Sequence, residues 1–135
     1  MANVHFIPNI TEQYDCLIAT DVLEHVPNPI EIFVRMIHCV KPNGYLLIAN
    51  NFYPVIKCHL PRTFHLRYTF DIIAKNMGLK NCGILQGSHA TIYKTSEYEP
   101  NINKKIICIE CYSNMLYHVK TIKHAGLNFL KKKVV

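Results

Sequence analysis

A short apolar segment, followed by an acid and a proline-started helix, constrains the fold of this chain most. Residues 14–19 read Tyr-Asp-Cys-Leu-Ile-Ala, with four consecutive apolar residues. Continuous rather than alternating apolarity predicts a strand of a parallel sheet that is covered on both faces. Asn28 and Pro29 then suit the N-cap and first position of a helix. Apolar residues recur at helical spacing up to Val40, and residues 45–49 predict the next strand.

The rest of the chain continues the alternation of strands and helices. A polar and aromatic loop is expected over residues 50–68, and a helix capped by Thr69 and stopped by Gly78 follows it. Strand candidates at 81–85 and 90–94 are joined by a hairpin-type turn, and residues 4–7 suit a short strand remnant. A last helix is expected over 104–124, with an apolar side of Ile109, Leu116, Val119 and Ile122.

This order of elements predicts an α/β sheet with right-handed crossovers. In such sheets ligands bind beyond the carboxyl ends of the strands. Two segments meet that condition, residues 20–27 and the loop from residue 50 onward. We therefore expect the chemistry to gather at one edge of the sheet.

Composition indicates a single globular domain. The chain has 135 residues, of which 50% are apolar and 18% charged, and that balance favours a folded core over disorder. No apolar run approaches the roughly 20 residues that span a bilayer, and the N-terminus does not resemble a signal peptide. We expect a cytoplasmic protein without a membrane partner. Part of the net charge of +6 is the C-terminal run Lys131-Lys132-Lys133, which is interpreted as a solvated tail, and the rest is dispersed, so nucleic-acid binding is not expected.

The six cysteines give a weaker signal. Only Cys108 and Cys111 have Cys-x-x-Cys spacing, and a zinc site would need a second pair or histidines at ligand spacing. Reduced, unpaired thiols are the expected state. A Cys/His metal-binding module stays as a third, weaker interpretation.

The combined string YDCLIATDVLEHVPNP…CVKPNGYLLIANN, residues 14–29 and 39–51, resembles a known family. It is similar to the fourth strand, following loop, helix and fifth strand of class I S-adenosylmethionine-dependent methyltransferases, especially those that methylate quinones and small metabolites. The family's usual LKPGG turn reads VKPNG here, and Asn43 tolerates a left-handed backbone as glycine does. The resemblance covers residues 14–94 of a single domain, 1–135, and leaves 95–135 as a C-terminal extension.

The resemblance implies a partial Rossmann-like sheet, mostly parallel with an antiparallel C-terminal strand pair. It implies methyl transfer from S-adenosyl-L-methionine to a small-molecule acceptor, with no metal required. The loop after the first strand would then face the cofactor through Thr20, Asp21, Val22 and Leu23. Glu24 and His25 would face the reaction centre, with His25 as a general base or, equally, with both residues only bracing the loop. The acceptor would lie against Asn50, Asn51, Tyr53, His59, Arg62, His65 and Arg67.

One departure from the family pattern affects activity. Family members hold the cofactor with a Gly-x-Gly-type loop, and none of the five glycines, at 44, 78, 83, 87 and 126, makes that loop. The chain is therefore expected to be truncated, with the missing half supplied elsewhere, or to be a non-catalytic remnant acting as an interaction module. In either case the strand at 14–19 would have an open flank, which predicts a homodimer through that edge, covering of the edge by the N-terminal segment, or poor solubility.

Overall fold

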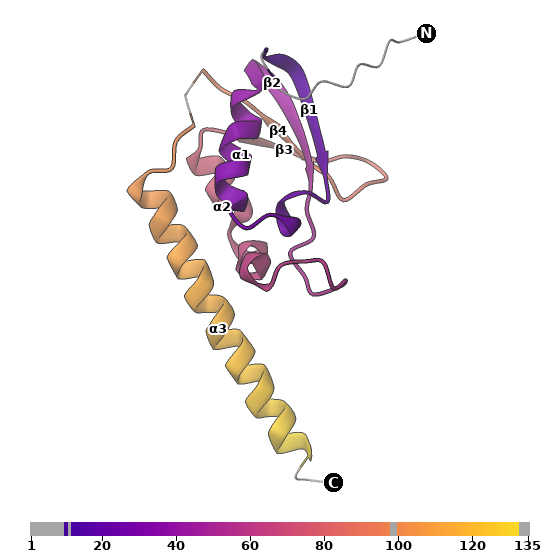
Figure 1. The fold of residues 1–135 in the computed structure, drawn as a ribbon, viewed down its shortest axis with the longest axis vertical. Coiled ribbons are helices and arrows are strands. Elements are labelled where there is room, and N and C mark those ends of the chain that lie inside the picture. Colours follow the sequence, from indigo (N-terminus) through magenta and orange to yellow (C-terminus); the bar gives the residue numbers. More distant parts are fainter. Residues whose placement is uncertain (1–9, 11, 98–99, 133–135) are drawn as a thin grey trace.

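The computed structural model describes residue 10 and residues 12–97 and 100–132, with side chains up to residue 123. The chain is a mixed α/β fold, which confirms the predicted fold class (Figure 1). In chain order its elements are β1 (Tyr14–Thr20), η1 (Leu23–His25), α1 (Pro29–His38), β2 (Val40–Ala49), η2 (Pro61–Tyr68), α2 (Phe70–Asn76), β3 (Lys80–Ile84), β4 (Thr91–Lys94) and α3 (Lys104–Lys132). The candidate strand at 4–7 lies outside the described residues.

The four strands form one sheet in the order β1-β2-β4-β3. β1 pairs with β2 in parallel, and β4 runs antiparallel to both β2 and β3. The predicted antiparallel strand pair near the C-terminal end of the sheet is thus confirmed. Within the part of the chain that the structure describes, β1 pairs with β2 alone and forms an edge of the sheet.

The second strand begins earlier than predicted. β2 starts at Val40 rather than at residue 45, and α1 already ends at His38. The Val40–Gly44 segment, expected to be a turn, instead pairs irregularly with β1. Asn43 has the left-handed backbone expected there, with φ of 63°. Asn28 occupies the N-cap position of α1, but its side chain makes no capping bond and donates instead to Glu31.

The hydrophobic core lies between the helices and one face of the sheet. Phe33 of α1 and Ile73 of α2 are fully buried in the same cluster as Leu46 of β2. The opposite face is open, because Ile18 is 68% exposed and Tyr45 is 43% exposed. The prediction that the first strand is covered on both faces is therefore wrong for the described chain. Continuous apolarity in β1 marks one buried face and one exposed apolar face.

The last helix is longer than predicted and only partly packed. α3 begins at Lys104, as expected, and continues to Lys132. Its first half packs on η2 and α2, where Ile106 and Ser113 are fully buried. Val119 and Ile122 of the predicted apolar side are exposed, because α3 extends away from the sheet (Figure 1). Among the described residues, no helix is apolar enough over a sufficient length to cross a membrane.

Candidate functional site

The carboxyl ends of β1 and β2 meet at one edge of the sheet, as the sequence predicts. The backbone N–H of Asp21 donates to the carbonyl of Ala49 at 2.9 Å and ties the two strand ends together. Asp21 has a left-handed φ of 52°, which turns the chain sharply out of the strand. Thr20 and Asp21 are exposed and Val22 is half-buried, whereas Leu23 is fully buried in the core.

Glu24 is the most completely enclosed of the predicted site residues. Its side chain is fully buried in η1, and Oε1 accepts a hydrogen bond from the backbone N–H of Asn51 at 2.7 Å. Its carbonyl accepts a second bond from the N–H of Leu60 at 2.9 Å. Glu24, which follows β1 in the chain, therefore fixes both ends of the loop that follows β2. The other carboxylate oxygen, Oε2, has no hydrogen-bond partner among the described residues.

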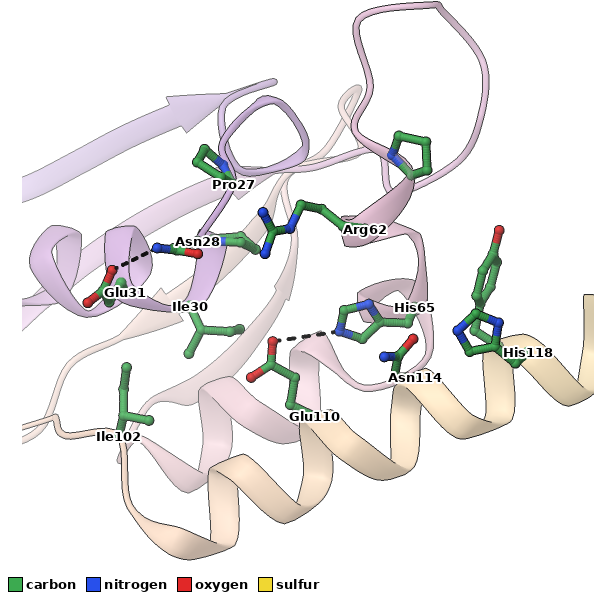
Figure 2. A pocket seen from close by; sticks show the side chains of 13 residues that line it. Pro27, Asn28, Ile30, Glu31, Arg62, His65, Ile102, Glu110, Asn114 and His118 are labelled. Carbon is green, nitrogen blue, oxygen red and sulfur yellow. Dashed lines mark hydrogen bonds and ion pairs between the residues drawn. The ribbon is translucent and has the colours of Figure 1, made fainter.

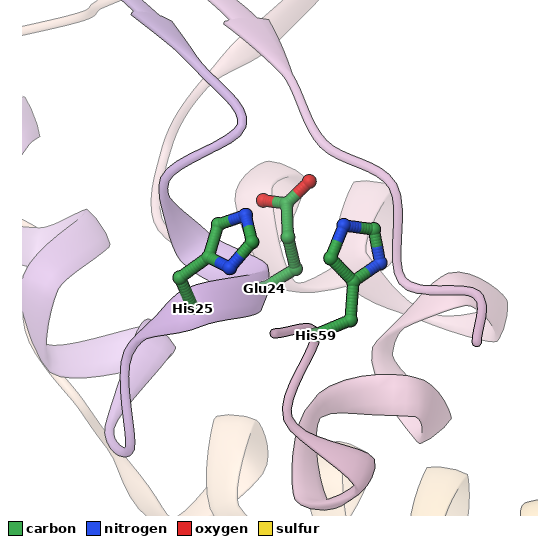
Figure 3. Close-up of side chains that lie close together, drawn as sticks. All are labelled: Glu24, His25 and His59. Atoms are coloured by element: carbon green, nitrogen blue, oxygen red, sulfur yellow. The ribbon is translucent and has the colours of Figure 1, made fainter. Parts of the chain in front are cut away.

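Two histidines flank this carboxylate. Nδ1 of His25 lies 3.1 Å from the carbonyl of Cys58, and Nδ1 of His59 lies 2.7 Å from the carbonyl of Tyr53. The two imidazole rings pack edge to face with their centroids 4.9 Å apart, and the Glu24 carboxylate lies between them (Figure 3). The structure thus brings His59, expected on the acceptor side, together with Glu24 and His25, expected at the reaction centre.

Three further predicted acceptor residues line a hollow of about 250 Å³ below the end of β2: Asn50, Tyr53 and Arg67. The guanidinium of Arg67 stacks over the rings of Tyr53 and Tyr68, at 4.8 and 5.0 Å, and lies 5.2 Å from the ring of Tyr117 in α3. Within the described chain, Nε of Arg67 and Oδ1 of Asn50 are buried without a hydrogen-bond partner. This hollow therefore offers the positively charged guanidinium of Arg67, held in place by aromatic rings, and an amide oxygen of Asn50 that is free to accept a hydrogen bond.

Asp71 and Tyr93 line the same hollow and form a hydrogen-bonded group. Asp71 Oδ1 accepts from Asn81 Nδ2 at 2.7 Å and from the Tyr93 hydroxyl at 3.2 Å, and Lys75 pairs with Oδ2 at 2.9 Å. Burial alone would raise the pKa of Asp71, but these donors outweigh it and hold that pKa below its ordinary value. Burial, and then the Asp71 charge, raise the pKa of Tyr93. The phenol is thus a hydrogen-bond donor, not a base, at neutral pH.

Two more of the predicted acceptor residues, Arg62 and His65, line a separate and larger cavity of about 690 Å³ (Figure 2), while the seventh, Asn51, bonds Glu24 through its backbone N–H. It lies between η2, the start of α1 and α3. His65 Nε2 is 3.7 Å from Glu110 Oε1, and the Ser113 hydroxyl donates to the His65 carbonyl at 2.6 Å. Sequence reasoning missed Glu110, because nothing in the sequence indicated that α3 packs on η2. The predicted acceptor residues are thus divided between two cavities and the His–Glu group.

The Cys-x-x-Cys pair does not form a ligand cluster in this structure. Cys108 and Cys111 are free and exposed on α3. Among the described residues, the one set of three or more candidate ligand side chains that could hold a metal ion is Glu24, His25 and His59. A metal-binding module built on the two cysteines therefore has no further ligand nearby within the described chain.

Comparison with known proteins gives one match. A family model described as a methyltransferase domain matches residues 2–73, which is more than half of the chain. The match includes β1, η1, α1, β2 and η2, and hence the whole edge at which the strand ends meet. No curated protein and no solved structure matches the chain.

Proposed function

Because the chain belongs to the class I S-adenosylmethionine-dependent methyltransferase family, we propose that it takes part in methyl transfer to a small molecule. The observation that carries this proposal is the coincidence of the family match with the strand-end geometry. Matched residues 20–25 and 50–53 lie at one edge of the sheet, where ligands of α/β sheets bind.

The cofactor would bind over the end of β1. Thr20 and Asp21 are exposed there, and Asp21 is turned outward by its left-handed backbone. Its carboxylate can accept hydrogen bonds from hydroxyl or ammonium groups, both of which S-adenosyl-L-methionine carries. Val22 supplies half-buried apolar surface, and Leu23 supports the loop from the core. The cofactor supplies an activated methyl group, so the protein's task is to orient the acceptor and to exclude water.

The acceptor would enter the hollow beneath Asn50, Tyr53 and Arg67. Its volume of about 250 Å³ suits a small molecule rather than a polymer. Arg67, held by aromatic rings, favours an acceptor that carries an anionic or phenolic oxygen. The larger, separate cavity at Arg62 and His65 offers an alternative place for an acceptor.

The absence of a Gly-x-Gly pair from the sequence shapes this proposal. Residues 20–23 would cover one side of the cofactor only, and another segment would have to cover the other side. The alternative is a non-catalytic methyltransferase-like module whose role is interaction. Among the described residues β1 is an edge strand, and this edge together with the exposed apolar side chain of Ile18 favours this alternative.

Calorimetric titration of the folded chain with S-adenosylhomocysteine, the reaction product, distinguishes the two functions. The proposal predicts micromolar binding that weakens about tenfold in Asp21→Ala, as expected for one lost charged hydrogen bond. Asp15→Ala is the matched control, because Asp15 is also exposed but lies at the start of β1 beside Lys41. No binding by a folded, monodisperse sample would refute a cofactor site in this chain and favour the interaction module.

A further inference from the structure

We propose that Glu24, His25 and His59 form a binding site for one divalent transition-metal ion, for which Zn²⁺ is the best match. Their ligand atoms all lie within 4.8 Å of one another, and the three side chains converge from η1 and from the loop after β2 (Figure 3). This departs from the expectation that no metal is required. It does not depend on the proposed methyl transfer.

A buried carboxylate oxygen of Glu24 without a partner among the described residues indicates a place for a cation. Glu24 is fully buried, and its Oε2 has no hydrogen-bond partner in the described part of the chain. An ionised carboxylate oxygen removed from water without a partner is costly, by several kcal/mol in general. Oε1 is already satisfied by Asn51, so the missing partner belongs on the side of Oε2. A bound cation between the two imidazoles would supply it.

The hydrogen bonds of the two histidines orient both rings as metal ligands. In each ring Nδ1 faces a backbone carbonyl oxygen, which can only accept, so Nδ1 must carry the proton. A neutral imidazole with its proton on Nδ1 presents the lone pair of Nε2. Metal-binding histidines are commonly oriented in this way, with the second nitrogen donating to a carbonyl. The Cys58 and Tyr53 carbonyls therefore fix both rings as ligands.

The ligand types select the class of metal. Two imidazole nitrogens and one carboxylate oxygen suit Zn²⁺ or a related ion, whereas Mg²⁺ and Ca²⁺ prefer oxygen ligands throughout. Ligands 2.0–2.2 Å from a tetrahedral ion lie about 3.4 Å from one another, so the side chains would move slightly inward on binding. Three protein ligands leave a fourth position open, which is the pattern of catalytic rather than structural zinc sites.

Metal binding would also join two parts of the candidate site. Glu24 and His25 follow β1, while His59 lies in the loop that follows β2 and precedes η2. An ion bound to all three would fasten this loop over the strand ends. We therefore expect the ion to raise thermal stability as well as to bind.

The test is titration of the metal-stripped full chain with Zn²⁺, followed by Co²⁺ in its place. The proposal predicts one ion per chain, and cobalt absorption bands without the near-ultraviolet band that thiolate ligation produces. Glu24→Gln keeps the shape of the side chain, and His59→Ala and His25→Ala each remove a ring. Each should weaken binding at least about 100-fold, the upper end of the effect of losing a supporting group.

Matched controls separate this site from binding by three of the free thiols and from chance histidine binding. His38→Ala removes an exposed histidine at the end of α1. Cys58→Ser removes the free thiol next to His59, and the double variant Cys108→Ser/Cys111→Ser removes the two free thiols of the Cys-x-x-Cys sequence. Binding should persist in all three controls. Circular dichroism shows which variants fold. If a histidine variant does not fold, the zinc affinity of Glu24→Gln tests the site. No stoichiometric binding, or binding that survives Glu24→Gln and is lost with the cysteines, would overturn the proposal.

Discussion

At the scale of single residues, the site depends on buried polar groups whose partners come from distant parts of the chain. Glu24 is bonded by Asn51, and Asp71 is bonded by Asn81 and Tyr93. The resemblance to the methyltransferase family singled out Glu24 and His25 in the loop after the first strand. It could not pair them with His59, because that contact depends on how the loop after β2 folds back onto η1.

Asp71→Asn tests one of these groups through its pH dependence. The lowered pKa of Asp71 means that its ionised form stabilises the fold above its unfolded pKa of about 3.9. That contribution is lost as the pH falls through the folded pKa. We expect the variant to be about 1 kcal/mol less stable at pH 7, a modest value because the side chain is 43% exposed.

Urea unfolding at pH 7 and at pH 3 measures this difference. The gap between wild type and Asp71→Asn should narrow at pH 3, while Glu12→Gln, at an exposed position, should change little at either pH. A difference in unfolding free energy between wild type and Asp71→Asn that is the same at pH 7 and pH 3 would contradict the assigned role of the Asp71 charge.

At the scale of elements, the main difference from the sequence prediction is the early start of β2. The sequence pattern Lys-Pro-Asn-Gly indicates a turn, and Asn43 does have a turn-type backbone. Pairing with β1 nevertheless extends β2 back to Val40. Tertiary contact here overrides local turn chemistry. A Cβ on Gly44 would lie 2.8 Å from the Asp15 carbonyl and 2.7 Å from Val40 Cγ1.

Gly44→Ala therefore tests how closely β1 and β2 approach. We expect a loss of about 1–3 kcal/mol in the free energy of unfolding, the usual cost of overpacking, because one of the opposing atoms belongs to the backbone. Asn43→Gly is the neighbouring control, since glycine adopts the same left-handed backbone without strain. Equal stability of Gly44→Ala and wild type in urea unfolding would contradict this packing.

At the scale of the whole molecule, sequence reasoning could predict the alternation of elements and the mixed sheet, because apolar periodicity is a local property. It could not predict which faces of the elements are covered. Ile18 and Ile122 look like core residues in sequence, yet both are largely exposed. Likewise the division of the acceptor residues between two cavities depends on the packing of α3 against η2, which leaves no local signal.

The open edge and exposed face of β1 lead to a prediction about assembly. We expect a homodimer through residues 14–19, because an apolar strand whose outer backbone groups find no partner in the described part of the chain readily pairs with another. Ile18→Lys should shift the protein to monomer in sedimentation velocity, since a charge on an edge strand opposes such pairing. Ile122→Lys, at a similarly exposed isoleucine of α3, should leave the dimer intact. A wild-type monomer at all concentrations would exclude this interface.

We propose that methyltransferase chemistry gathers at the edge where β1 and β2 end. Backbone amide chemical shifts of the isotope-labelled chain, recorded during titration with S-adenosylhomocysteine, test that claim most directly. We expect the largest shifts in residues 20–25 and 49–53. No shifts at excess ligand, or shifts centred on the cavity between η2 and α3, would contradict it.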